Sequence, residues 1–165
     1  MKIRHLEEFD HKDLHNIYSF TEVMANTSQL PFLSSSQVSN LFSASNQYTL
    51  VAEVDGKVVG HVTLFLTDKV RDKHTASIAI AVHPESHGQG VGKALMHEAI
   101  NQSDNWLNLV RVELEVHADN LSAKALYEKV GFETEGIKRL STFKSGRYID
   151  MVIMSRISPA HRMNA

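Results

Sequence analysis

The stretch His83-Pro-Glu-Ser-His-Gly-Gln-Gly-Val-Gly-Lys93 separates an apolar run, Ala76–Val82, from a run with helical apolar spacing, Val91–Gln102. The order is therefore strand, glycine-rich turn, helix. Three glycines within five residues let a ligand come close to the backbone, because no Cβ stands in the way. Unpaired amides and the positive end of the helix dipole favour an anion at the helix start. The stretch thus predicts a pyrophosphate site, typical of an enzyme that binds a nucleotide or a coenzyme.

Three other interpretations of this stretch are weaker. A Walker-type loop needs Ser or Thr after its lysine to bind magnesium, whereas Ala94 follows Lys93. A dinucleotide-binding fold places G-x-G-x-x-G after its first strand, whereas these glycines are spaced G-x-G-x-G in the middle of the chain. A tight strand-to-helix connection without a ligand remains an alternative, although it needs fewer glycines.

A second stretch, His117–Phe132, resembles the N-x-x-A-x-x-x-Y-x-x-x-G-F signature of the GNAT acyl-CoA N-acyltransferases. The first stretch resembles the Q/R-x-x-G-x-G/A coenzyme A loop of that family, except that His87 stands where Arg or Gln is usual. The two motifs have the family's order and spacing, and the resemblance covers nearly the whole chain. It implies an α/β (α+β) GNAT fold. This is a mixed central sheet of about seven strands, splayed between strands 4 and 5, with helices on both faces.

Alternating and helical patterns place the elements along the chain. Asp55-Gly56 and Ser145-Gly146 predict hairpin turns, Asp10 is expected to cap the first helix, and Ile78–Val82 reads as a strand covered on both faces. The predicted strands are residues 2–6, 48–54, 57–66, 75–83, 109–116, 134–143 and 147–156. The predicted helices are residues 10–20, 36–43, one beginning at 91, and one that ends at about residue 130 and is capped by Asp119 or Asn120. Residues 24–36 are expected to be irregular.

Bulk composition limits the classes of function. The 165 residues predict a single domain, 1–165, with a short polar tail from about residue 157. A net charge of −2 gives no basic surface for nucleic acid, and no apolar run reaches the ~18 residues of a membrane helix. The absence of cysteine excludes disulfides and a thiolate nucleophile and fits a cytoplasmic location. Ten scattered histidines indicate no metal site, and both a monomer and a homodimer remain open.

The resemblance implies acetyl-CoA as cosubstrate. The amides of residues 88–93 are expected to bind its pyrophosphate, and the strand edge near Ile80 and Val82 its pantetheine arm. A backbone amide near Val82 is expected to polarise the thioester carbonyl. Asn120 matches the motif asparagine that contacts the coenzyme, and a helix N-cap is its second expected role. The coenzyme-binding residues predicted on these grounds are Ile80, Val82, His87, Gly88, Gln89, Gly90, Val91, Gly92, Lys93, Asn120 and Tyr127.

Two residues are predicted to move protons. Tyr127 matches the family's tyrosine next to the coenzyme sulfur and is expected to act as general acid, whereas helical spacing alone favours a core residue. Strand alternation places Glu113, Glu115 and His117 on one face. A carboxylate on a covered strand is unusual unless it is paired or working, so both glutamates are candidates for the general base. Glu115 is preferred over Glu113 because it lies twelve residues before Tyr127, a spacing that resembles the proposed base of the ribosomal-protein N-terminal acetyltransferases. Pairing with Arg111, or an open face, is the alternative.

The acceptor is expected to be a small-molecule amine. Asn26-Thr-Ser-Gln-Leu-Pro31 resembles the N-T-x-Q-x-P segment of bacterial L-amino-acid N-acetyltransferases. It makes Asn26, Thr27 and Gln29 candidate substrate-binding residues and favours the α-amine of a free amino acid. Acetylation of a protein N-terminus or lysine is an alternative. A coenzyme-sensing module without turnover is another.

Overall fold

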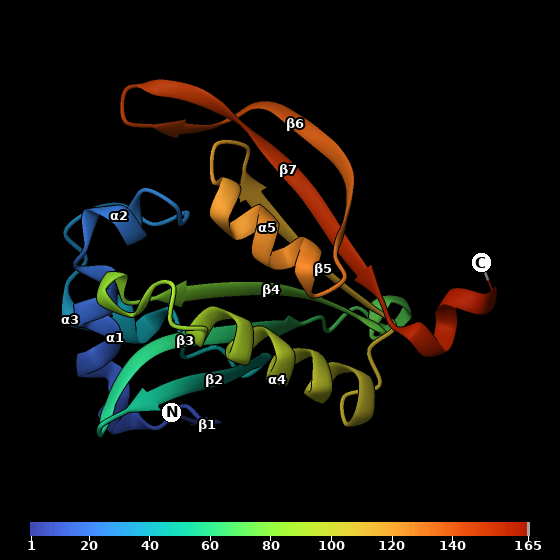
Figure 1. Ribbon diagram of the computed structural model, residues 1–165, viewed down its shortest axis with the longest axis horizontal. Coiled ribbons are helices and arrows are strands. Elements are labelled where there is room, and N and C mark those ends of the chain that lie inside the picture. Colours follow the sequence, from blue (N-terminus) through green and yellow to red (C-terminus); the bar gives the residue numbers. More distant parts are fainter. Residues whose placement is uncertain (165) are drawn as a thin grey trace.

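A seven-stranded mixed sheet organises residues 1–164, the part of the chain that the computed structural model describes (Figure 1). Its order is β1-β2-β3-β4-β5-β7-β6, and β4–β5 is its parallel pair. The strands are β1 (Lys2–His5), β2 (Gln47–Val54), β3 (Lys57–Leu66), β4 (Thr75–Val82), β5 (Arg111–His117), β6 (Glu133–Lys144) and β7 (Arg147–Ile157).

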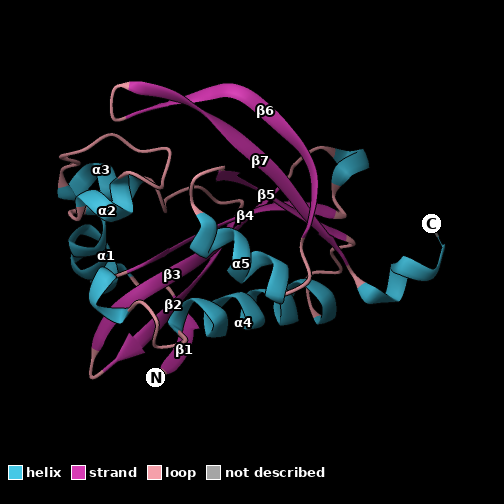
Figure 2. Ribbon diagram, turned by 45° about the horizontal axis from the view of Figure 1, so that its top comes forward, coloured by secondary structure: helices cyan, strands magenta, loops and turns pink. Residues whose placement is uncertain are grey.

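Helices cover both faces of this sheet. The α-helices are α1 (His11–Tyr18), α2 (Thr21–Met24), α3 (Ser35–Asn40), α4 (Val91–Asn105) and α5 (Leu121–Lys129). Short 3-10 helices are Glu8–Asp10, Val70–Asp72, Pro84–Ser86 and Pro159–Asn164. Figure 2 shows α4 and α5 close together on one face, with α1, α2 and α3 gathered at the end of the sheet where β4 finishes.

Two hydrophobic cores follow from this layering. The larger lies under α4 and α5 and includes Leu64, Leu95, Met96, Leu114 and Met154, all at most 4% exposed. The smaller lies under α1, α2 and α3. The centres of β2 and β3 are almost entirely buried. Because both faces are covered, apolar and polar residues do not alternate regularly along these two strands.

The predicted hairpin turns are confirmed. Asp55 and Gly56 have φ of 50° and 77°, and Ser145 and Gly146 have φ of 50° and 81°. Two consecutive positive φ angles are the signature of a type I′ turn, whose twist matches that of the strands it joins. These turns fix the β2–β3 and β6–β7 pairings.

The predicted splay between the fourth and fifth strands is confirmed. Only three residue pairs join β4 to β5: Thr75 with Arg111, Ala76 with Val112, and Ser77 with Glu113. Beyond Ser77 the two strands diverge, and Figure 1 shows their arrows running apart. β5 remains fully paired with β7, and β4 with β3, so the sheet opens at this one position.

Opening of the sheet corrects the prediction for Ile78–Val82. That run was expected to be covered on both faces, but Ala79 is exposed. Its side chain lies on the face opposite α4, in the region where β4 has separated from β5. Ile78 and Ala81 are buried in the larger and the smaller core respectively, whereas Ala79 borders the gap and is left uncovered.

Asp10 does not cap α1, contrary to the prediction. Its carboxylate accepts hydrogen bonds from Arg4 Nη1 and Nη2 at 2.7 and 2.8 Å and from the Glu7 amide at 2.9 Å. Asp10 itself has helical backbone angles and makes no side-chain cap. A buried carboxylate paired with arginine therefore ties β1 to the start of the helical layer.

The segment expected to be irregular, residues 24–36, has no helix or strand from residue 25 to 34; α2 ends at Met24, and α3 begins at Ser35, capped by Ser34. The tail expected from about residue 157 is ordered at its start: Ile157 ends β7, and the buried Ser158 donates its amide to Val110 O at 2.8 Å. Residues 159–164 form a 3-10 helix, and Ala165 lies outside the described residues.

The smaller core holds a buried histidine. His61 is 2% exposed, its Nε2 lies 3.0 Å from the Tyr18 hydroxyl, and its ring packs against Tyr18 and Phe42. Burial lowers the pKa of His61 to about 3, because desolvation disfavours the charged ring. The folded protein therefore holds His61 neutral.

His61 is expected to make stability depend on pH. Its folded pKa lies below the ordinary value of 6.5, so the unfolded chain binds more protons between pH 6.5 and about 3. His61 contributes stability above pH 6.5 that is lost as the pH falls, by at most about 1.4 kcal/mol per pH unit. Urea unfolding of His61→Gln between pH 7 and 4 should show a shallower pH slope than the wild type. Parallel slopes would contradict a buried neutral His61.

Candidate active site

The turn after β4 is built by local hydrogen bonds. His83 Nδ1 accepts from the Glu85 amide at 3.3 Å, and the His87 amide donates to Pro84 O at 3.0 Å. Gln89 Nε2 donates to Glu85 O at 2.7 Å. The side chain of this predicted coenzyme-binding residue therefore stabilises the turn by a hydrogen bond within it. The turn then ends at Gly90, the residue that precedes α4.

The three glycines of the turn have different roles. Gly88 and Gly90 have φ of 72° and 83°, and a Cβ at either would meet nothing within 4 Å. Their outer side is therefore open to a ligand. A Cβ at Gly92 would lie 3.2 Å from Leu126 Cδ2, so Gly92 permits the close approach of α4 to α5.

The start of α4 presents amides without helical partners. The first intrahelical bond of this turn runs from the Ala94 amide to Gly90 O at 2.9 Å. By helix geometry, the amides of residues 91–93 precede the region where an intrahelical acceptor exists. Together with the helix dipole they form a site suited to a phosphate group.

The edge of β4 faces the gap. His83 N donates to Val59 O of the neighbouring strand β3 at 2.8 Å. Along a strand, the backbone N–H and C=O groups of successive residues point to opposite edges. Those of Ile80 and Val82 therefore point towards β5, beyond the last β4–β5 pair. His87 Nε2 donates to Val82 O at 2.9 Å, which leaves the Val82 amide directed into the gap.

His87, which stands where the family loop usually has Arg or Gln, contacts both the end of β4 and α2. Besides bonding to Val82, its Nδ1 lies 3.4 Å from Glu22 Oε1 of α2. The ring therefore connects the end of β4 to the helical layer on the other face.

Tyr127 lies on α5 with its ring almost completely buried. The residue lines the cleft described below. Burial raises the pKa of Tyr127 to about 12. The phenol is consequently protonated at neutral pH and is able to donate to a ligand in the cleft.

Asn120 caps α5, as one of its two predicted roles requires. Its Oδ1 accepts from the Ala123 amide at 3.2 Å and from Ser122 Oγ at 3.1 Å. The side-chain amide nitrogen is not used by the cap, and Asn120 lines the cleft. Capping and ligand contact are therefore compatible.

Glu115 lies on the β5 face opposite α5, and this face is open where a covered one was expected. Glu115 is 44% exposed and forms an ion pair with Lys138 of β6. Glu113 pairs with Arg111 at 3.0 Å, which was the alternative considered for these carboxylates. His117, by contrast, is buried, and desolvation together with the charge of Lys144 lowers its pKa.

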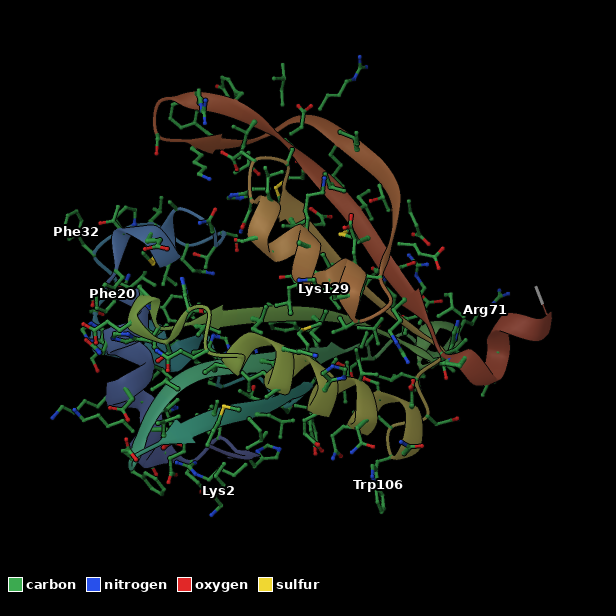
Figure 3. The ribbon with its side chains drawn as sticks, viewed as in Figure 1. Lys2, Phe20, Phe32, Arg71, Trp106 and Lys129 are labelled. Carbon is green, nitrogen blue, oxygen red and sulfur yellow. The ribbon has the colours of Figure 1, made fainter. Side chains whose placement is uncertain are left out.

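The predicted acceptor loop reaches the site only in part. Asn26 and Thr27 line the cleft, whereas Gln29 does not. Lys144 of β6 bonds to Asn26 Oδ1 at 3.2 Å and to both carboxylate oxygens of Asp119, so it ties the loop to the start of α5. Further along the loop, Phe32 is fully exposed and points away from the molecule (Figure 3).

One cleft of about 510 Å³ brings most of the predicted residues together. Gln89 and Gln29 are the predicted residues that it does not include. It runs from the glycine turn, through the β4–β5 gap, to Glu115 on the other face. Its predicted lining residues are Asn26, Thr27, Ile80, Val82, His87, Gly88, Gly90, Val91, Gly92, Lys93, Glu115, Asn120 and Tyr127.

Sequence patterns did not reveal several residues at this site. Glu22, Ser122 and Lys129 also line the cleft, and Lys138 and Lys144 contact its lining residues. Lys138 reaches Glu115 across β7, a contact between strands that no local motif signals. Within residues 1–164, no cluster of histidine and carboxylate groups suits a metal ion, and no helix is long and apolar enough to cross a membrane.

Comparisons with known proteins agree with this geometry. A model of the acetyltransferase (GNAT) family matches residues 4–132. The L-amino acid N-acetyltransferase AaaT of Escherichia coli is 38% identical, over 94% of this chain and 96% of that protein. The spermidine N(1)-acetyltransferase of Vibrio cholerae is 27% identical over 92% of this chain and 89% of its own length. A crystal structure of a Vibrio cholerae spermidine N-acetyltransferase with CoA and spermine has a TM-score of 0.84, 26% identity and 95% coverage of both chains.

Replacing Gly90 with valine should weaken coenzyme binding. The new side chain would occupy the open space beside the α4 amides, and we expect a loss of about 2 kcal/mol or more in acetyl-CoA affinity. Isothermal titration calorimetry measures the change directly.

Gly56→Val is the matched control for Gly90→Val. Gly56 has a similar φ of 77° and equally open surroundings, but it lies in the β2–β3 turn outside the cleft. Both variants carry the same backbone strain, so only the Gly90 variant should lose affinity. Equal affinities in the two folded variants would exclude the glycine turn as the pyrophosphate site.

Proposed function

The chain belongs to the GNAT acetyltransferase family, and we propose that the amine it acetylates is the α-amine of a free amino acid. It is an acetyl-CoA-dependent N-acetyltransferase. The observation that carries the proposal is the 38% identity, over nearly the full length of both chains, to an L-amino acid N-acetyltransferase. The placement of Asn26 and Thr27 in the cleft supports it, because these residues begin the segment that resembles that group.

Polyamines are the second candidate acceptors. They are favoured by the 26–27% identity to spermidine acetyltransferases and by the shared fold. These identities are lower than the 38% identity to the L-amino acid N-acetyltransferase, so free amino acids remain the first candidate acceptors. A protein N-terminus or lysine side chain, the alternative from the sequence, requires that a peptide enter the cleft beside Glu115.

The coenzyme-binding residues act mainly through their backbones. Acetyl-CoA supplies the thioester whose acetyl group is transferred. Amides of residues 88–93 bind the pyrophosphate, and the free edge of Ile80 and Val82 bonds the pantetheine amides as an added strand would. We assign to the Val82 amide the polarisation of the thioester carbonyl.

Two side chains handle the protons. The amine enters as an ammonium and loses one proton to Glu115, directly or through water. The neutral nitrogen bonds to the acetyl carbon and releases its second proton to solvent. The bond from that carbon to sulfur breaks with its electron pair on sulfur, which takes the proton of Tyr127. Solvent then returns a proton to Tyr127 and removes one from Glu115, so the exchange balances. No residue needs to form a covalent intermediate, which suits a chain without cysteine.

A substrate panel tests the proposed acceptor. Coenzyme A release from acetyl-CoA should be fastest with one or more free L-amino acids, compared with spermidine, spermine and peptides bearing free N-termini. Higher kcat/KM values for polyamines or peptides would refute the amino-acid assignment and leave the family activity intact.

Tyr127→Phe should lower kcat about a hundredfold or more and leave acetyl-CoA affinity nearly unchanged. The substitution removes the one hydroxyl that we assign to protonating sulfur and keeps the buried ring. Tyr48→Phe is the control, because that hydroxyl bonds to Gln102 Oε1 away from the cleft. A kcat within about threefold of the wild type would make Tyr127 a packing residue.

A further inference from the structure

Glu115 and Lys138 form an ion pair at the acceptor end of the cleft. Lys138 Nζ contacts Glu115 Oε1, and the two side chains are 47% and 44% exposed. They come from β6 and β5, on the same face of the sheet, with β7 between them. The pair therefore lies where an acceptor meets the cleft, on the side away from α4 and α5.

Neither member of this pair is saturated by other residues. Among the side chains of residues 1–161, Glu115 accepts through Oε1 alone, and Lys138 Nζ donates to Glu115 alone. The neighbouring charged groups differ. Arg111 bonds to both oxygens of Glu135 and to Glu113, and Lys144 bonds to Asp119 and Asn26. Glu115 and Lys138 thus retain one acceptor oxygen and two donor hydrogens for a ligand.

We propose that this pair recognises the zwitterionic head of an α-amino acid, with the amino group on Glu115 and the α-carboxylate on Lys138. The inference rests on the proposed function and names Lys138 as the residue that sets acceptor specificity. An α-amino acid carries a positive and a negative group two bonds apart. A contacting carboxylate and ammonium form the complementary arrangement, so the ligand aligns head to tail with the pair.

Binding in this way also releases the general base. In the free protein Lys138 Nζ donates a hydrogen bond to Oε1 of Glu115, so this oxygen already has a partner. When the α-carboxylate of the substrate takes over Lys138, Glu115 becomes available to the amine beside it. An acceptor with an α-carboxylate thereby activates its own deprotonation.

The same pair disfavours the other classes of acceptor. A polyamine brings a second positive charge into the region of Lys138, with no anion to balance it. A peptide N-terminus offers an α-amine but has a neutral amide where the carboxylate would bind. Lys138 therefore discriminates among acceptors that present nearly the same nucleophile.

Lys138→Met tests the inference. Two substrates are compared: the L-amino acid that the wild type acetylates best, and the primary amine that lacks only its carboxylate. The variant should raise KM for the amino acid about tenfold or more, the effect of losing one charged hydrogen bond. It should leave kcat/KM for the amine within threefold of the wild-type value or raise it, so the preference for the amino acid falls.

Two further variants complete the design. Arg139→Met removes the adjacent cation of β6, which, unlike Lys138, forms no ion pair with Glu115, and should leave the substrate preference unchanged. Lys138→Arg keeps the charge and should retain most of the preference. A Lys138→Met preference within threefold of the wild type, or equal losses for both substrates, would overturn the inference while the proposed function stands. A wild type that acetylates no free amino acid overturns both.

Discussion

The early end of the β4–β5 ladder is the constraint on which the site depends. Backbone N–H and C=O groups inside a sheet need partners, and β5 stops providing them to β4 after Ser77. The edge of Ile80 and Val82 is left facing a gap, since the opposite edge of β4 remains bonded to β3. A ligand with amide groups of its own restores the missing bonds, which makes the gap a site suited to pantetheine.

Connectivity then brings the other groups to this opening. The crossover from β4 through α4 to β5 places the start of α4 at the carboxyl end of β4, and α5 begins at the carboxyl end of β5. Two helix starts and one open strand edge therefore meet at the same end of the sheet. The face with α4 and α5 carries the residues that we propose bind the coenzyme, while Glu115, Lys138 and the Asn26–Thr27 loop face the other side. An acetyl group in the gap is reachable from both.

Local chemistry explains which features could be predicted from the sequence. Two positive φ angles in succession require residues such as Asp-Gly or Ser-Gly, so both hairpins were evident. Gly88 and Gly90 stand at left-handed positions, and Asn120 is an N-cap, so the turn and the helix start were evident too. The splay was expected from the family resemblance, because no residue pattern states where two parallel strands stop pairing.

Contacts between distant residues were beyond local patterns. Asp10 looked like a helix cap because its carboxylate lies next to a helix start, but Arg4 and the Glu7 amide bind it more strongly. The exposure of Ala79 depends on the position of β5, and the pair of Glu115 with Lys138 depends on the register of three strands. For the same reason the acceptor side of the cleft was less predictable than the coenzyme side, which is formed by consecutive residues.

Residue-resolved amide hydrogen exchange, measured by NMR with and without coenzyme A, shows whether the β4 edge is free and whether the coenzyme binds there. The account predicts an alternation along β4 in the free protein: the amides of Ala79 and Ala81, bonded to β3, exchange slowly, and those of Ile80 and Val82 exchange fast. Coenzyme A should slow exchange at Ile80, Val82 and residues 91–93 and leave Ala79 and Ala81 as they are. Slow exchange at Ile80 and Val82 in the free protein, or no response there to saturating coenzyme A, would contradict the account.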